Sequence, residues 1–154
     1  MVIVNSTPIL GLQGIGRLEL LQEVFREITI PEAVRREVTV KDAHMLDDYV
    51  RIHVAQIANY SMKESFTSAL HDGEVEVIIL AKEHNAKLVI LDDKLARQHA
   101  RYLGLNVIGT VGVLLRAKRK GIISEVRPML DNLIQTGFFL SDAIYNEALR
   151  LSEE

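Results

Sequence analysis

The sequence predicts an α/β protein, a three-layer α/β/α sandwich with a mainly parallel central sheet. Short apolar runs with strand character alternate along the chain with longer segments of helical periodicity. The first run, Val2–Val4, consists of β-branched residues without polar alternation, which is typical of a strand buried on both faces. Strands that alternate with helices in this way favour parallel pairing and helices on both faces of the sheet.

The elements of the first half follow from local patterns. Apolar residues at positions 18, 20, 21, 24 and 25 form a stripe with helical spacing. Pro31 suits the first turn of a helix, where its missing N–H costs nothing. The predicted elements are a strand at Val2–Val4, a helix at Arg17–Phe25, a strand at Glu27–Ile30, a helix from Pro31 to Val38, a helix at Lys41–Val50 and a strand at Ile52–Ile57.

The second half contains the most informative stretch, LHDGEVEVIILAKEHNAKLVILDD. Asp72 or Gly73 can cap a helix there, and Gly104 ends a later one. The predicted elements are a helix from this cap to about His84, a strand at Leu88–Leu91, a helix at Lys94–Leu103, a strand at Val107–Ile108, a helix from about Val111 to Lys120, helices at 124–136 and 142–152, and a short strand at 138–140.

Composition sets the outer limits of function. A length of 154 residues predicts one domain over residues 1–154 with a sizeable core. A net charge of −3 means that an anionic partner needs a local basic patch. The absence of cysteine excludes disulfides and thiolate zinc sites, and together with the lack of a signal peptide it predicts a cytoplasmic protein. No apolar run approaches the roughly 20 residues of a membrane span.

Polar side chains follow two of the predicted strands. Asn5 comes directly after the first strand, and Asp92 and Asp93 come directly after Leu88–Leu91. In a parallel sheet, ligands bind outside the carboxyl ends of the strands. These positions are therefore the first candidates for a functional site.

Two glutamates are expected to join them. Glu76 lies in the first turns of an apolar helix, and its neighbours one turn on, Ile79 and Leu80, predict an inward-pointing carboxylate. Glu37 lies near the end of the helix that begins at Pro31. Carboxylates that converge in a cleft repel one another unless a cation is present. Mg²⁺ or Mn²⁺ is the hard ion that suits such oxygens and can position a water at a phosphodiester.

Five motifs follow one another along the chain: Asn5-Ser6-Thr7-Pro8, Pro31-Glu32-Ala33-Val34, Gly73-Glu74-Val75-Glu76-Val77, Leu91-Asp92-Asp93 and Gly109-Thr110-Val111-Gly112-Val113-Leu114. In this order they resemble the PIN-domain family, the metal-dependent ribonuclease fold that includes VapC-type toxins of toxin–antitoxin pairs. The likeness is closest to a compact prokaryotic branch and covers nearly the whole chain.

The resemblance implies a site and its partners. Four acidic positions of the family cluster around one or two divalent ions, Mg²⁺ or Mn²⁺, and they fall on Asn5, Glu37, Glu76 and Asp93. The first of them is an amide in this chain. An amide oxygen still ligates a cation but brings no charge, so weaker metal binding and weaker catalysis are expected. The resemblance also implies an RNA substrate, an antitoxin partner and a homodimer, and the candidates for a second sphere are Thr110, Asp92 and Glu74.

Each candidate also has a structural interpretation. Asn5 suits a turn in which its side chain bonds nearby backbone. Asp93 suits a helix N-cap, and Glu76 suits a capping box that starts at Gly73. The remaining alternatives are a surface ion pair of Glu37 with Arg35 or Arg36, a solvated first-turn Glu74 and a helix cap at Thr110.

The basic run Arg116–Lys120 is the candidate for binding phosphates. Together with Lys94, Arg97 and Arg101 it could form a patch. Its alternative is a solvated helix end that complements the helix dipole, and no aromatic residues are interleaved to stack bases. The residues assigned to RNA binding are Lys94, Arg97, Arg116 and Lys118.

Two other functions fit the same residues. The amide at position 5 favours a PIN domain without activity that binds RNA or a protein partner. An α/β domain that binds a small ligand, with its acids serving only as helix caps, would show no dependence of stability on metal ions.

Overall fold

The computed structural model describes residues 1–66 and 69–154. Its centre is a five-stranded sheet in the order β3-β2-β1-β4-β5, and every neighbouring pair in it is parallel. The predicted parallel sheet is therefore confirmed. The strands are β1 (Val2–Val4), β2 (Ile28–Pro31), β3 (Ile52–Ala55), β4 (Leu88–Ile90) and β5 (Val107–Ile108).

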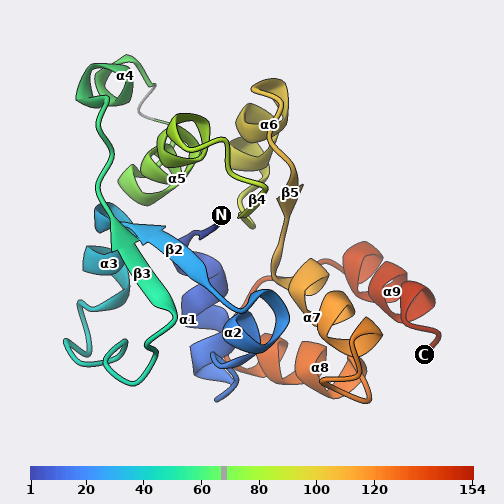
Figure 1. Ribbon diagram of the computed structural model, residues 1–154. Helices are drawn as coiled ribbons and strands as arrows, with labels where there is room; N and C mark the ends of the chain where they lie inside the picture. The colour runs from blue at the N-terminus through green and yellow to red at the C-terminus, as the bar shows by residue number, and fades with distance from the viewer. Residues whose placement is uncertain (67–68) are drawn as a thin grey trace.

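Helices cover both faces of this sheet, which confirms the three-layer arrangement. The long helix α5 packs across β1, β2 and β4, and α6 lies beside it in the upper part of Figure 1. The helices α1, α2, α7, α8 and α9 gather on the other side of the sheet. The helices are α1 (Ser6–Gly14), α2 (Leu20–Phe25), α3 (Glu32–Val38), α4 (Tyr60–Ser65), α5 (Asp72–Glu83), α6 (Lys94–Tyr102), α7 (Thr110–Arg119), α8 (Arg127–Gln135) and α9 (Asp142–Leu151).

The core is centred on β1, which is covered on both faces and paired on both edges. Ile3, Val4, Ile30 and Ile90 have no exposed surface. Each such side chain contributes roughly 1.5–3 kcal/mol through burial. Val4 pairs with Ile90, and the N–H of Asn5 donates to the carbonyl of Ile90 at 3.0 Å. The end of β1 is therefore held firmly against the end of β4.

The sheet has a topological switch point between β1 and β4. From β1 the chain continues to β2 and β3 on one side, and it then returns to add β4 and β5 on the other. The connections after β1 and β4 lead away in opposite directions, which leaves a crevice outside their carboxyl ends. Asn5 and Asp92-Asp93 follow these two strands, so the fold places them where a ligand is expected to bind.

The helix α1 was not predicted, because its opening Asn-Ser-Thr-Pro suggested a turn. Pro8 lies in its first turn, where proline is tolerated. Gly11 weakens the helical signal but has a packing reason, since a Cβ there would lie 3.0 Å from the ring of Phe138. The helix predicted at Arg17–Phe25 begins only at Leu20.

The helix predicted at Lys41–Val50 is wrong, and these residues form turns. Backbone bonds here span three residues, as from Met45 N–H to the Asp42 carbonyl at 3.2 Å. The Asp42 side chain accepts from the His44 N–H at 3.0 Å. Short polar side chains compete in this way with helical hydrogen bonds.

The strand predicted at 138–140 is also wrong. Gly137 has a φ of +96°, and the next N–H, of Phe138, bonds back to the carbonyl of Leu133 at 2.9 Å, which closes α8. The helix α4 had no predicted counterpart. None of the helices in the described part of the chain has the length and apolar character needed to cross a membrane.

Candidate functional site

Asn5 links the end of β1 to the start of α1, and its side chain does not cap the helix. It occupies the N-cap position of α1, yet its side chain makes no capping hydrogen bond. Only 4% of the residue is exposed, and its Oδ1 has no hydrogen-bond partner among the described residues. The turn interpretation, in which this amide bonds nearby backbone, is not what the structure shows.

Glu37 reaches the same place from α3. The hydroxyl of Ser6 donates to its Oε2, and the N–H of Gly73 donates to its Oε1 at 3.0 Å. A Cβ on Gly73 would lie 2.7–2.8 Å from these carboxylate oxygens, so only glycine allows α5 to begin so close to Glu37. Glu37 forms no ion pair with Arg35 or Arg36 in the described part of the chain, and Arg35 is bonded to Glu32 instead.

Glu74 enters from the first turn of α5 and is buried, with 5% exposure. Burial and the adjacent carboxylate of Asp93 raise the pKa of Glu74 from 4.5 to about 7, and His71 opposes the shift. Its Oε2 has no hydrogen-bond partner among the described residues. Glu74 is therefore not the solvated first-turn acid considered from the sequence.

Asp93 lies against Glu74 and caps the next helix. Its Oδ2 accepts from the N–H of Ala96 at 2.9 Å at the start of α6. The capping interpretation of Asp93 is confirmed. One carboxylate oxygen is engaged in the cap, and the residue is exposed to solvent.

Asn5, Glu37 and Glu74 line a cleft of about 330 Å³ at the carboxyl edge of the sheet, and Asp93 lies next to Glu74 outside this lining. The cleft wall combines one amide, two hydroxyls, one imidazole and two carboxylates. They come from the residue after β1, from α1, α3 and α5, and from the residue before α5. The residues that line it are Asn5, Ser6, Thr7, Glu37, His71 and Glu74.

Glu76 lies outside this cleft, although the sequence analysis placed it inside. Its Oε1 accepts from the N–H of Ala33 at 3.0 Å, and its Oε2 is 2.6 Å from Nζ of Lys63. The carboxylate is thus neutralised by α4 and bound to the first turn of α3. These two partners also exclude the capping box with Gly73. Glu74 stands in the cleft in its place.

Asp92 and Thr110 form a separate link between β4 and α7. Asp92 accepts from the Thr110 N–H at 2.9 Å and from its hydroxyl at 2.6 Å. Burial raises the pKa of Asp92, while Thr110 and the nearby Arg97 oppose the shift. Asp92 thereby satisfies the first turn of α7, which is a structural role.

The four candidates for RNA binding do not form one patch. Lys94 and Arg97 lie on α6 beside Asp93, and Arg97 donates to the Leu91 carbonyl at 3.0 Å. Arg116 points toward the opposite edge of the sheet, with its guanidinium 5.8 Å from the Phe25 ring centroid. Lys118 donates to the Ser152 carbonyl at 2.6 Å. Only the α6 pair lies near the cleft.

The cleft oxygens suit a hard divalent cation in type. The side-chain oxygens that are buried without a partner in the described residues, Asn5 Oδ1 and Glu74 Oε2, both belong to this cleft. Amide and carboxylate oxygens are ligands that Mg²⁺ and Mn²⁺ accept. Within residues 1–66 and 69–154, however, no three Asp, Glu, His or Cys side chains converge to hold a metal ion. The amide at position 5 is one reason.

Four residues of the cleft, Ser6, Thr7, His71 and Glu74, had been overlooked or misjudged from the sequence. Ser6 adjoins Asn5 and could have been found from that neighbour. The choice between Glu74 and Glu76 had no usable signal, because every residue from 73 to 81 of α5 is buried. Without a polar stripe, the sequence does not show which of the two acids faces which neighbour.

Known proteins were compared with this chain and its fold. A family model named DUF3368 and described as a PIN domain matches residues 1–154. A PilT N-terminus domain protein from the hyperthermophilic archaeon Sulfolobus solfataricus P2 has a similar structure, with a TM-score of 0.53 and 21% identity over 92% of this chain and 98% of that chain. That likeness shows the fold alone. No curated protein matches the sequence. Because the family model spans every residue, the chain belongs to the PIN-domain family.

Proposed function

We propose that this PIN domain is an endoribonuclease that cleaves RNA phosphodiester bonds with Mg²⁺ or Mn²⁺ held in the cleft. PIN domains generally have a nuclease fold and use divalent metal ions. The observation that carries the proposal is the pair of buried oxygens without partners, Asn5 Oδ1 and Glu74 Oε2, on one cleft. Buried polar atoms are normally hydrogen-bonded, so two such oxygens on residues that line one cleft support the binding of a ligand there.

The side chains have distinct roles under this proposal. Asn5 and Glu74 would hold the cation, and Glu37 would complete the set from the opposite wall. When bound there, such a cation supplies charge stabilisation to the phosphodiester oxygens and acidity to a water. Ser6 and the Gly73 N–H fix both oxygens of Glu37, which limits its rotation and sets its orientation. Lys94, at the start of α6 next to Asp93, would contact an RNA phosphate under this proposal.

The resemblance to toxin–antitoxin nucleases extends the proposal to partners. It makes this chain the toxin-like member of a pair, inhibited by an antitoxin protein and assembled as a homodimer. These partners are not needed for the test below, which uses the chain alone.

The second candidate is a PIN domain that binds RNA or a protein partner without cleaving. Asn5 favours it, because a cation at this cleft meets one negative charge fewer than in the acidic site of the family. The absence of a three-acid metal group from the described residues points the same way. The two candidates differ in one measurable property, which is cleavage.

The test is cleavage of a fluorescent single-stranded RNA with Mn²⁺, and with EDTA as the metal-free arm. Wild type, Glu37→Gln, Asn5→Asp and the control Glu125→Gln are compared, since Glu125 is an exposed acid outside the cleft. The proposal expects cleavage by wild type and the control, faster cleavage by Asn5→Asp, and a loss of about a hundredfold or more in Glu37→Gln.

Two results would decide for the second candidate. If Asn5→Asp cleaves and wild type does not, the scaffold is competent and the amide has removed the activity. If no variant cleaves but wild type retains RNA on a filter, binding without catalysis is the function. A loss of equal size in Glu125→Gln would contradict any role of the cleft.

A further inference from the structure

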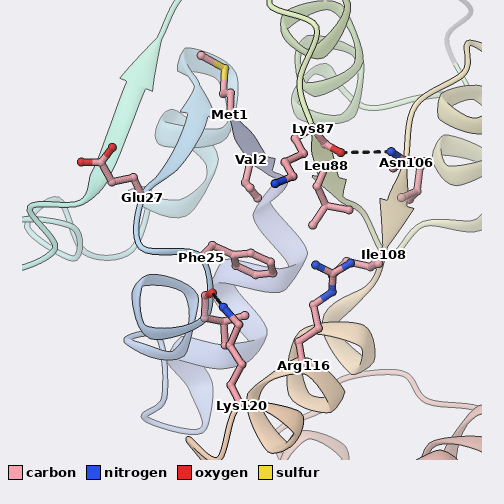
Figure 2. Close-up of a pocket in the computed structure, with 12 residues that line it drawn as sticks. Met1, Val2, Phe25, Glu27, Lys87, Leu88, Asn106, Ile108, Arg116 and Lys120 are labelled. Atoms are coloured by element: carbon pink, nitrogen blue, oxygen red, sulfur yellow. Dashed lines mark hydrogen bonds between the residues drawn. The ribbon is translucent and has the colours of Figure 1, made fainter.

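A second cavity lies at the opposite edge of the sheet from the cleft. Its volume is about 760 Å³, and its walls come from the starts of β1 and β4, the strand β5, the end of α2 and the helix α7. Figure 2 shows it between the sheet and the helical layer below. A volume of this size is ordinary for a small-molecule site. None of the residues that line it belongs to the cleft described above.

Two cationic side chains converge on this space. Lys87 and Arg116 both extend into the cavity from opposite sides, whereas the carboxylate of Glu27 points away from it (Figure 2). Neither Lys87 nor Arg116 has an acidic partner in the part of the chain that the structure describes. A third cation, Lys120, is engaged with the Val24 carbonyl at 2.6 Å.

The guanidinium of Arg116 is held in a defined position. It lies over the ring of Phe25 at 5.8 Å from the centroid, and the residue is only partly exposed. This contact orients its donors toward the cavity without using them. Two like charges that face a partly enclosed space repel, and an anion between them removes that cost.

The other residues that line the cavity indicate which kind of molecule the anionic group belongs to. Val2, Leu88, Ile108 and the Phe25 ring supply an apolar wall beside the two cations. The wall suits an organic body rather than a bare inorganic ion. A phosphate monoester carries a charge of about −1.5 to −2 at pH 7, which matches two cations, and arginine binds its oxygens in a bidentate manner.

We propose that this cavity binds a phosphate monoester on an organic body of nucleotide size, through Lys87 and Arg116. The inference does not depend on the proposed nuclease activity, because it uses no residue of the cleft and no metal ion. The sequence analysis had assigned Arg116 to the binding of RNA phosphates. The cavity gives this residue a different ligand.

Isothermal titration calorimetry at low ionic strength tests the proposal on the full chain after removal of divalent ions. The probes are adenosine 5′-monophosphate, inorganic phosphate, adenosine and benzoate. The monophosphate should bind more tightly than phosphate or adenosine alone, because only it offers both the dianion and the body. Benzoate, with a body but one charge, distinguishes a general organic anion from a phosphate monoester and should bind more weakly.

The variants identify the cavity as the site. Arg116→Gln and Lys87→Gln should each raise the Kd for the monophosphate by about tenfold, as expected for loss of one charge-assisted contact. Arg119→Gln is the matched control, since it removes the same charge from an exposed position of α7 that does not line the cavity. Glu37→Gln in the cleft should leave the Kd unchanged.

The proposal is overturned by any of three results. The first is no saturable binding of the monophosphate by wild type at millimolar concentration. The second is an equal loss in Arg119→Gln, which would mean binding by net charge alone. The third is a change of Kd confined to Glu37→Gln, which would place the anion in the cleft. If Arg116→Gln lowers the melting temperature, Lys87→Gln decides, because Lys87 is exposed.

Discussion

Glu74 and Glu76 lie two positions apart on α5, and their carboxylates have opposite surroundings. Glu76 is matched by Lys63 and the Ala33 N–H, whereas Glu74 faces the carboxylate of Asp93. The sequence predicted the helix correctly, but it placed Glu76 in the cleft, where the structure has Glu74. Glu76 is held outside the cleft partly by Lys63, and Lys63 belongs to α4, a helix that no local pattern predicted.

The raised pKa of Glu74 predicts a pH-dependent stability. Its pKa is about 7 in the folded protein against an ordinary value of 4.5, so the protonated form stabilises the fold below pH 4.5. This contribution is lost as the pH rises through 7, by roughly 3 kcal/mol at most. In metal-free buffer, Glu74→Gln should therefore melt about 3–8 °C higher than wild type near pH 8.

Thermal melts of the two proteins at several pH values check this prediction. The difference should shrink toward zero near pH 5, where the carboxyl of Glu74 is protonated in the folded state. Glu125→Gln serves as the control, because Glu125 is exposed. A constant difference between wild type and Glu74→Gln at all pH values would mean that the effect comes from packing and not from ionisation.

At the scale of single elements, α5 depends on a close approach to α3. Gly73→Ala should destabilise the protein by roughly 1–3 kcal/mol, because its Cβ would lie 2.7–2.8 Å from the Glu37 oxygens. Urea unfolding measures the change. Gly14→Ala is the matched control, since its nearest neighbour is 3.8 Å away, and alanine should add up to about 1 kcal/mol of helix stability there. Equal stability of Gly73→Ala and wild type would show that Glu37 moves aside freely.

Lys63 links α4 to α5 through an ion pair with the buried Glu76 at 2.6 Å and a longer one with Asp72 at 3.8 Å. Lys63→Met should cost roughly 1–3 kcal/mol, because it leaves the Glu76 carboxylate, whose side chain is 5% exposed, without its cation. Adding Glu76→Gln should recover part of the loss, and a double-mutant cycle in urea measures the coupling. Lys41→Met, at an exposed position, should change little. Additive losses in the double variant would show that the pair contributes no coupling.

The helices and strands that were predicted correctly are those with strong local signals. The strands β1, β4 and β5 and the helices α5, α6 and α7 have apolar runs bounded by caps or glycine. The two main failures are α1 and the segment Lys41–Val50. In the first, Gly11 meets Phe138 from a distant part of the chain. In the second, the side chain of Asp42 accepts a hydrogen bond from the nearby backbone N–H of His44. Neither tertiary contact nor local competition is visible in a hydrophobic pattern.

At the scale of the whole molecule, the chain end joins three helices. The Glu154 carboxylate accepts from the N–H groups of Val126 and Arg127 at 2.8 and 2.9 Å, and from Lys118 at 3.0 Å. Burial raises the pKa of Glu154, but these donors outweigh burial and lower it from 4.5 to about 2. The ionised carboxylate therefore stabilises the fold above about pH 4.5, and this contribution is lost as the pH falls through 2.

Glu154→Gln should accordingly lower stability at pH 7 by roughly 1–2 kcal/mol, because charge-assisted hydrogen bonds become neutral ones. Denaturant unfolding at pH 7 and at low pH checks the prediction. The gap between wild type and variant should close as the pH approaches 2. Glu153→Gln, at an exposed position next to it, is the control. A gap that persists in strong acid would contradict the role of ionisation.

The overall architecture could be predicted because it depends on the alternation of strands and helices along the chain and not on individual side-chain contacts. Polar residues after β1 and β4 were correctly expected at one edge, since parallel strands end together. What could not be predicted is the opposite edge of the sheet, where Lys87 and Arg116 line one cavity. Residues 87 and 116 are separated in sequence and share no motif, so only the folded chain brings them to one cavity.

The central position of β1 also determines when the protein can first be assembled. The strand β1 has β2 on one side, but its other neighbour, β4, is synthesised only at residues 88–90. Until then the partner carbonyl of Asn5, on Ile90, does not exist. Pairing across such a sequence separation is slow and leaves an open strand edge in the nascent chain. A chain that ends before residue 88 therefore contains every residue that lines the cleft, but it lacks the strand that pairs with β1 and the carbonyl that holds the Asn5 N–H.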